Sequence, residues 1–200
     1  MTVRTLLTAV GAVLSITLSA GMATAQDAPA PAARSSVLDK AVNDVRVSGW
    51  IIYGPGQTTT LVESTVQGGF AQRIDLPRAG ANPWDVGAAA VTTKPIQNGD
   101  VLAVAVWIRT ERAPAGSDTG RITLRLQGNA EPYPEIATET LQPGGEWKLY
   151  FTQATATRDY APGEAAVNIQ LAAAAQAIEL GPIFILDMGP DFDRSTLPTN

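Results

Sequence analysis

The alternation of residue types in the stretch 101–109 constrains the fold of this chain more than any other feature. One face of this stretch is aliphatic and carries Leu102, Val104, Val106 and Ile108. The other face carries Ala103, Ala105, Trp107 and Arg109. A period of two places successive side chains on opposite faces of a β-strand, whereas a helix requires a period of about 3.6. The stretch therefore predicts a strand with a core face and an outer face.

The same alternation recurs and predicts a protein built from strands. It is clear in residues 121–127, 147–152 and 167–171, and further strands are expected at residues 59–66, 70–76, 86–92, 136–141 and 177–188. Turn residues such as Asn98-Gly99-Asp100 separate them, and a helix of one or two turns is expected only within residues 36–44. Many short strands between turns predict an all-β antiparallel β-sandwich, most plausibly a jelly roll.

Composition excludes several kinds of site. The 200 residues include no His and no Cys, which rules out a Ser-His-Asp triad, a cysteine nucleophile, a zinc finger and a disulfide framework. With 45% hydrophobic and 16% charged residues, the chain has the balance of one globular domain.

The chain is expected to begin with segments outside this domain. Residues 1–25 combine Arg4, an apolar run and Ala23-Thr24-Ala25, which is typical of a cleaved secretory signal peptide, the alternative being a membrane anchor. An Ala/Pro-rich tether at 26–35, the sandwich at 36–190 and a polar tail at 191–200, too polar to pack, complete the expected organisation. We therefore expect a bacterial protein that is secreted or periplasmic and does not contact the membrane after cleavage.

The expected mature chain is acidic. Without Arg4 it has 13 basic residues against 19 acidic ones, a net charge of -6. Because such a surface repels phosphate backbones and no basic run is present, nucleic acid is not expected as a partner.

Several motifs in order resemble the carbohydrate-binding modules of families four, nine and twenty-two. They are the stretch from Asn82 to Val86 (NPWDV), residues 96–109, the stretch from Gly145 to Tyr150 (GEWKLY), residues 166–171 and residues 178–187. The resemblance covers about Gly49 to Met188 and implies a galactose-binding-like jelly roll that binds a polysaccharide or oligosaccharide without catalysis, usually beside a glycoside hydrolase. The chain departs from the family pattern at Gly87, where a polar residue is usual, and in residues 101–103, which lack the usual Tyr.

Candidate ligand-binding residues follow from the faces of the expected strands. Sugars stack their CH faces on aromatic rings and bind planar polar groups through their hydroxyls. The expected binding residues, all taken to lie outside the core, are Trp107, Arg109, Arg125, Asn168, Gln170, Trp84 and Tyr150, with Gln127 on the same expected face. The resemblance itself implies ligand contact for Trp107, Asn168 and Gln170.

Each of these assignments has a structural alternative. Trp107 can cover a second hydrophobic layer, and Arg109 and Arg125 can form a ladder of charges with acidic residues across strands. Trp84 can equally contact a ligand at the rim of the site or fill a gap in the packing. Other aromatic residues were assigned differently: Trp147 is expected in the core with Leu149 and Phe151, while Trp50 and Tyr53 either line the mouth of the site or cap the sandwich.

No certain cofactor is predicted, but the resemblance implies a structural calcium ion. Asp187 occupies the matching position, with Asp39, Asp44 or Glu63 as a partner ligand. The alternative is that Asp187, Asp191 and Asp193 belong to a solvated tail.

Two other functions stay open at this point. A small glycoside hydrolase needs only two carboxylates, yet no pair stands out among the acids, and no catalytic residue is assigned. An exported accessory protein that binds a protein partner and has no affinity for sugar is the second alternative. Exposed aromatic residues favour glycan binding, whereas buried ones favour the interaction protein.

Overall fold

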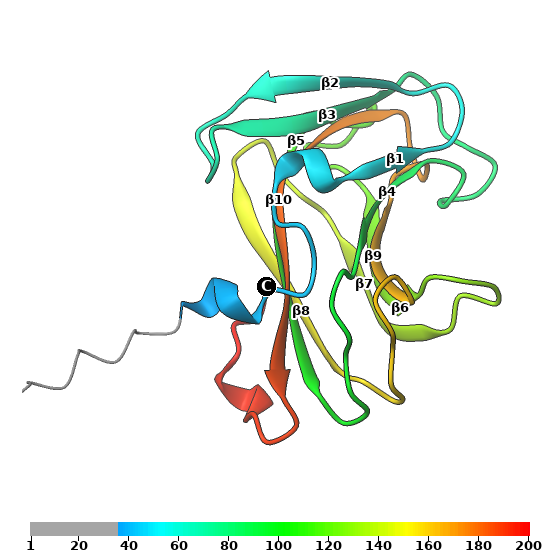
Figure 1. The fold of residues 1–200 in the computed structure, drawn as a ribbon. Helices are drawn as coiled ribbons and strands as arrows, with labels where there is room; N and C mark the ends of the chain where they lie inside the picture. Colours follow the sequence, from blue (N-terminus) through cyan, green and yellow to red (C-terminus); the bar gives the residue numbers. More distant parts are fainter. Residues whose placement is uncertain (1–35) are drawn as a thin grey trace, which may run out of the picture. The chain divides into compact units, whose positions relative to one another are not determined.

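The computed structural model describes residues 36–200, which form two antiparallel sheets packed face to face (Figure 1). The first sheet contains, in spatial order, β1 (Ile51–Tyr53), β4 (Gly87–Val91), β9 (Ala165–Gln170), β6 (Ile122–Gly128) and β7 (Glu135–Leu141). The second contains β2 (Thr58–Glu63), β3 (Phe70–Leu76), β10 (Gln176–Gly189), β5 (Val101–Arg112) and β8 (Lys148–Thr155). The β-sandwich predicted from the alternation is confirmed.

Helix is confined to short 3₁₀ segments in the described part of the chain. These are η1 (Val37–Lys40), η2 (Val47–Gly49) and η3 (Arg194–Thr196). Within residues 36–200, none of them has the length and apolar character that crossing a membrane requires. The expected signal peptide at 1–25 and tether at 26–35 lie outside the described residues.

The strand predictions agree closely with the structure. Every predicted strand is present, and β3 has the predicted bounds. Only β1 was missed, because three residues are too few to display a period. The helix expected within residues 36–44 is reduced to the single 3₁₀ segment η1.

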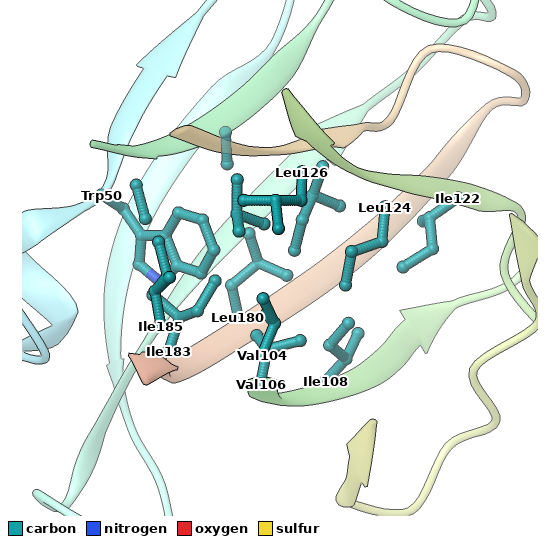
Figure 2. Packing of buried hydrophobic residues seen from close by; sticks show 14 of the residues in the cluster. Trp50, Val104, Val106, Ile108, Ile122, Leu124, Leu126, Leu180, Ile183 and Ile185 are labelled. Carbon is teal, nitrogen blue, oxygen red and sulfur yellow. The ribbon is translucent and has the colours of Figure 1, made fainter. Parts of the chain in front are cut away.

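The core lies between the two sheets and is built from the inward faces that alternation predicts. Val104, Val106 and Ile108 of β5 point toward Ile122, Leu124 and Leu126 of β6, with β10 residues beside them (Figure 2). Full burial of each such side chain contributes about 1.5–3 kcal/mol. The same parity sends Trp107 and Arg109 outward on β5, and Arg125 and Gln127 outward on β6.

Strand β8 corrects one prediction, because its inward face is the opposite of the expected one. Tyr150 is buried in the core cluster, paired with Val106 of β5, while Leu149 and Phe151 are half-buried on the outer face. Trp147, expected in the core, is half-buried outside it and lies beneath the Arg109 guanidinium, 5.3 Å from the ring centre. The sequence misleads here because both faces of this strand carry large apolar residues.

The polar tail at 191–200 is largely exposed, as expected, but it is hydrogen-bonded to the sandwich. Asn200 binds the backbone of Phe151 on the edge strand β8, where its Oδ1 accepts from the amide N at 2.7 Å and its Nδ2 donates to the carbonyl O at 2.8 Å. Arg194 donates to the Gln153 side chain of the same strand at 3.2 Å. The side-chain amide of Asn200 thus satisfies backbone groups that an edge strand otherwise leaves unpaired.

Candidate functional site

A cleft of about 520 Å³ lies over the outer face of the first sheet. Its volume falls in the range of small-ligand sites. The lining consists of aromatic, amide and small side chains with a single cation: Tyr53, Trp84, Ala89, Arg125, Gln127, Asn129, Pro132, Tyr133, Asn168 and Gln170.

The register of the strands forms the floor of this cleft. Ala89 of β4 pairs with Asn168 of β9, which pairs in turn with Arg125 of β6. Beside this row, Gly87 pairs with Gln170. Because the outward positions 87 and 89 of β4 carry little or no side chain, the sheet is hollowed where the amides of β9 stand.

Tyr53 closes one side of the hollow. Its hydroxyl donates to Asn168 Oδ1 at 3.0 Å, reaching across Gly87. A Cβ at position 87 would collide with that hydroxyl and with the carbonyl oxygen of Ile169. Burial raises the pKa of Tyr53 and outweighs the opposing charge of Arg125, so the phenol stays protonated as a donor. The departure of Gly87 from the family pattern therefore has a structural reason.

Trp84 stands on a braced turn at the rim. The Asp85 carboxylate accepts from the Asn82 backbone N at 2.9 Å, which lowers the pKa of Asp85 below its usual value. The adjacent residue Pro83 accepts at its carbonyl from the Ala172 amide at 3.0 Å. Gly54, with φ +95°, packs so closely that a Cβ would collide with the Asp85 carbonyl. The turn is thus fixed, and it presents a tryptophan that is 56% exposed.

A second exposed aromatic residue faces the cleft from the loop between β6 and β7. Tyr133 is 45% exposed and adopts φ 55°, an unusual value for a residue with a bulky side chain. Its amide N donates to the Ala130 carbonyl at 2.7 Å, and the Gly128 N donates to the Pro134 carbonyl at 2.8 Å. Backbone strain of this kind persists where surrounding contacts fix it, and it is often found at ligand sites.

The polar groups of the floor are buried yet incompletely satisfied. Gln127 is only 6% exposed, and its Oε1 has no hydrogen-bond partner among residues 36–200. Arg125 Nε is likewise buried without a partner within that part of the chain. Because buried polar groups in proteins are normally paired, these atoms mark a site whose hydrogen bonds are completed by something else, a ligand or water.

The structure brings together four of the seven predicted site residues. Arg125, Asn168, Gln170 and Trp84 all line the cleft, as does Gln127. Trp107 and Arg109 do not, since β5 belongs to the second sheet and their side chains lie on the opposite outer surface of the sandwich. Tyr150 is in the core. Alternation separates inside from outside, but a sandwich has two outsides, and only the topology assigns a strand to one of them.

Arg109 instead takes part in a network of charges on the second sheet, the alternative considered from the sequence. The Glu179 side chain, with 0% of its surface exposed, accepts from Arg109 Nε and from Arg73 Nη2, each at 2.6 Å. Burial alone raises the pKa of Glu179, but the hydrogen bonds from Arg109 and Arg73 outweigh it, so the pKa lies below its usual value. Trp107 lies beside Gly181, since a Cβ added to Gly181 would come within 2.8 Å of the Trp107 Cβ.

Sequence reasoning missed three parts of the cleft: Asn129, Pro132 and Tyr133. They lie in the loop at 129–134, whose composition of two prolines around a tyrosine is the only signal in the sequence. For Tyr53 and Trp50 the sequence left two roles open. Tyr53 lines the cleft, whereas Trp50 is buried in the core and donates from Nε1 to the Gly181 carbonyl at 2.9 Å.

Two of the expected partner ligands for calcium are already engaged by groups of the protein itself. The Asp39 carboxylate accepts from the Ser36 N at 2.7 Å, and Asp44 pairs with Arg46 at 2.6 Å. Within residues 36–200 no group of three or more acidic side chains is placed to hold a metal ion. Asp187 is half-buried, and burial followed by the neighbouring Asp100 raises its pKa despite Lys40. Calcium at Asp187 stays a prediction.

Comparison with known proteins shows which solved structures share this fold. No family model matches the sequence, and no curated protein matches it. Among solved structures, it is similar to the CBM22-1 xylan-binding domain of Xyn10C from Paenibacillus barcinonensis, with 15% identity, a TM-score of 0.50 and coverage of 75% of this chain and 94% of that one. The N-terminal cellulose-binding domain of β-1,4-glucanase C from Cellulomonas fimi has 18% identity, a TM-score of 0.52 and coverage of 76% and 97%.

Larger proteins contain the same fold as one part. This chain covers only 26% of a GH51 α-L-arabinofuranosidase, at 14% identity, a TM-score of 0.50 and with 74% of its own length aligned. A CBM4 structure, in contrast, is covered over 90% of its length by 68% of this chain, with 20% identity and a TM-score of 0.51. The described chain thus has the β-sandwich fold of carbohydrate-binding modules.

Proposed function

We propose that this protein binds a polysaccharide or oligosaccharide in the cleft on the first sheet, without catalysing a reaction on it. The observation that carries the proposal is the pairing of two exposed aromatic side chains, Trp84 and Tyr133, with a floor of amides from Asn168, Gln170 and Gln127. Aromatic rings stack on the CH faces of sugars, while amides both donate to and accept from hydroxyls.

The likeness in fold agrees with this proposal. Similar structures include a xylan-binding domain and a cellulose-binding domain. The cleft of this chain contains the chemistry that such ligands need, and its walls are fixed before a ligand arrives by the contacts of Tyr53, Gly54 and Asp85. A fixed site loses less conformational entropy on binding.

Binding without turnover is supported by the lining of the cleft. Its described residues include no Asp and no Glu. Hydrolysis of a glycosidic bond generally uses two carboxylates that flank it, one of them as an acid. The exposure of Trp84 and Tyr133 leaves both rings free to stack on a sugar, which a purely packing role would not.

The proposal is tested by calorimetric titration of the purified protein with xylohexaose, cellohexaose and mannohexaose. Calorimetry is preferred to fluorescence because the decisive variant, Trp84→Ala, removes the reporter itself. We expect saturable binding of at least one chain, with a loss of about 10-fold or more in Trp84→Ala, since stacking on one aromatic ring is worth roughly 0.5–1.5 kcal/mol beyond its buried area.

Trp107→Ala is the matched control, because it removes the same side chain from the opposite surface. Its affinity should equal that of the unaltered protein. Equal losses in both variants would contradict the location of the site. A folded protein that binds none of the three chains would favour the interaction protein instead.

We further propose that the protein acts outside the cytoplasm, in the periplasm or beyond the cell. The support is the pattern of residues 1–25 in the sequence. Mass spectrometry of the protein recovered from its native host tests this proposal, since cleavage after Ala25 leaves Gln26 as the first residue. Recovery of an intact N-terminus would contradict it.

A further inference from the structure

The cleft contains one cation, and its charge is poorly matched by the protein. Arg125 Nη2 lies 3.5 Å from the Glu135 carboxylate, and Glu135 is itself exposed. Four other arginines in the described chain approach a carboxylate oxygen to 2.6–2.7 Å: Arg46, Arg73, Arg109 and Arg112. Arg125 is thus held in the wall of the cleft with 26% of its side chain exposed, and Glu135 pairs with it at a longer distance than the carboxylates of those four arginines.

From this geometry we infer that the cleft binds a glycan chain carrying a uronic acid and that Arg125 pairs with the uronate carboxylate. The inference rests on the proposed function and specifies its ligand class. A guanidinium presents a planar fork of donors that matches a carboxylate in two parallel hydrogen bonds. A neutral sugar offers only hydroxyls, which leave the charge of the partly buried Arg125 to the exposed Glu135 alone.

The neighbours of Arg125 are suited to the rest of such a sugar. Asn168 pairs with Arg125 in register across the two strands, and its Oδ1 is already occupied by Tyr53, which leaves the amide NH2 to donate to a ring hydroxyl. Gln127, two positions along β6, has a buried Oε1 that accepts no hydrogen bond from residues 36–200. Adjacent side chains in the floor of the cleft therefore recognise both the carboxylate and a hydroxyl of the same sugar.

The number of charges limits the ligand further. Among the described residues that line the cleft, Arg125 is the only cation, and the sequence as a whole has a net charge of -5. One carboxylate per cleft is neutralised, whereas further carboxylates of a polyuronate would meet an acidic surface. The ligand that fits is a largely neutral chain with sparse uronic acid substituents.

Three probes that differ in one group test this inference by calorimetry at low ionic strength. They are xylohexaose, the same chain bearing a single glucuronic acid, and that substituted chain with its carboxylate methyl-esterified. We expect the acid to bind about 10-fold more tightly than the ester, and the preference to shrink as salt screens it. In Arg125→Gln the acid should lose this advantage, while the affinity for the ester stays within about 2-fold.

Arg158→Gln is the control for net charge, because it removes an exposed arginine that does not line the cleft. It should keep the preference for the acid. Equal affinity for acid and ester, or a preference that survives Arg125→Gln, overturns the inference and leaves the proposed function intact. Binding of none of the three probes overturns the inference together with the function on which it rests.

Discussion

The hydroxyl of Tyr53 holds the side chain of Asn168 in place, through a hydrogen bond of 3.0 Å between Tyr53 Oη and Asn168 Oδ1. The two residues are 115 positions apart in sequence and belong to strands that do not pair with each other, β1 and β9. This bond sets which end of the amide is free toward the cleft. It connects the edge of the first sheet with the middle of the binding floor.

Replacement of Tyr53 by Phe should therefore weaken ligand binding more than it weakens folding. The free energy of unfolding should fall by about 1 kcal/mol, the usual net value of one hydrogen bond. The affinity for the best-binding oligosaccharide should fall several-fold, because the amide of Asn168 loses its fixed orientation. Urea denaturation and calorimetry measure the two effects, and Asn168→Ala should remove any further effect of Tyr53→Phe on affinity. Additive losses in the double variant would show that the two residues act separately.

Gly87 should tolerate no side chain. Alanine at this position collides with the Tyr53 hydroxyl and with the backbone of Ile169, so we expect a loss of about 1–3 kcal/mol, the usual range for overpacking. Gly144→Ala serves as the control, since nothing lies within 4 Å of a Cβ placed there and its φ is not left-handed. Comparison of the two thermal midpoints tests the prediction, which fails if both variants melt alike.

The buried carboxylate Glu179 should contribute to stability through its two arginines. Glu179→Gln removes the buried counter-ion of Arg73 and Arg109 and leaves them only Glu111, at 3.3 and 3.4 Å. We expect a loss of about 2 kcal/mol, typical of hydrogen bonds to charged groups. Asp75→Asn disrupts the exposed pair with Arg112 and should cost at most about 1 kcal/mol. Denaturant titrations of both variants at neutral pH give the comparison, and an equal loss in the two would contradict the role assigned to burial.

The sequence predicts much of this fold because its signal is local. Alternation in β5 and β6 assigns Val104 and Leu124 to the core and Trp107 and Arg125 to the outside, and the structure agrees at each position. It fails where the signal is ambiguous, as in β8, where Tyr150 and Phe151 are both large and apolar.

The candidate site was only half predictable, for a different reason. Trp107 and Arg125 are both outward, yet the pairing of β5 with β10 and of β6 with β9 places them on opposite surfaces. Pairing between strands that are distant in sequence leaves no trace in the period of either strand. Tyr133 was missed because a loop has no period at all, and its position depends on contacts made by Gly128 and Ala130.

Asp187 should make the stability of the protein depend on pH. Burial is the main cause that raises the pKa of Asp187 above its unfolded value of 3.8, and the nearby carboxylate of Asp100 adds to it, while the hydrogen bond from the Gly189 N and, more weakly, Lys40 oppose the shift. A group whose pKa is raised in the folded state stabilises that state below the unfolded pKa, and this contribution is lost as the pH rises through the folded pKa. At pH 7 the ionised carboxylate is therefore a source of instability.

Replacement of Asp187 by Asn should remove this penalty while its Oδ1 still accepts from the Gly189 N. In EDTA we expect a higher Tm than that of the unaltered protein at pH 7, and a difference that closes toward about pH 3, where Asp187 is protonated. The reverse order at pH 7 would contradict the assigned cause. Repeating the melts with calcium tests the predicted ion: if it binds at Asp187, calcium raises the Tm of the unaltered protein and not that of Asp187→Asn, since folded-state ligands stabilise by mass action.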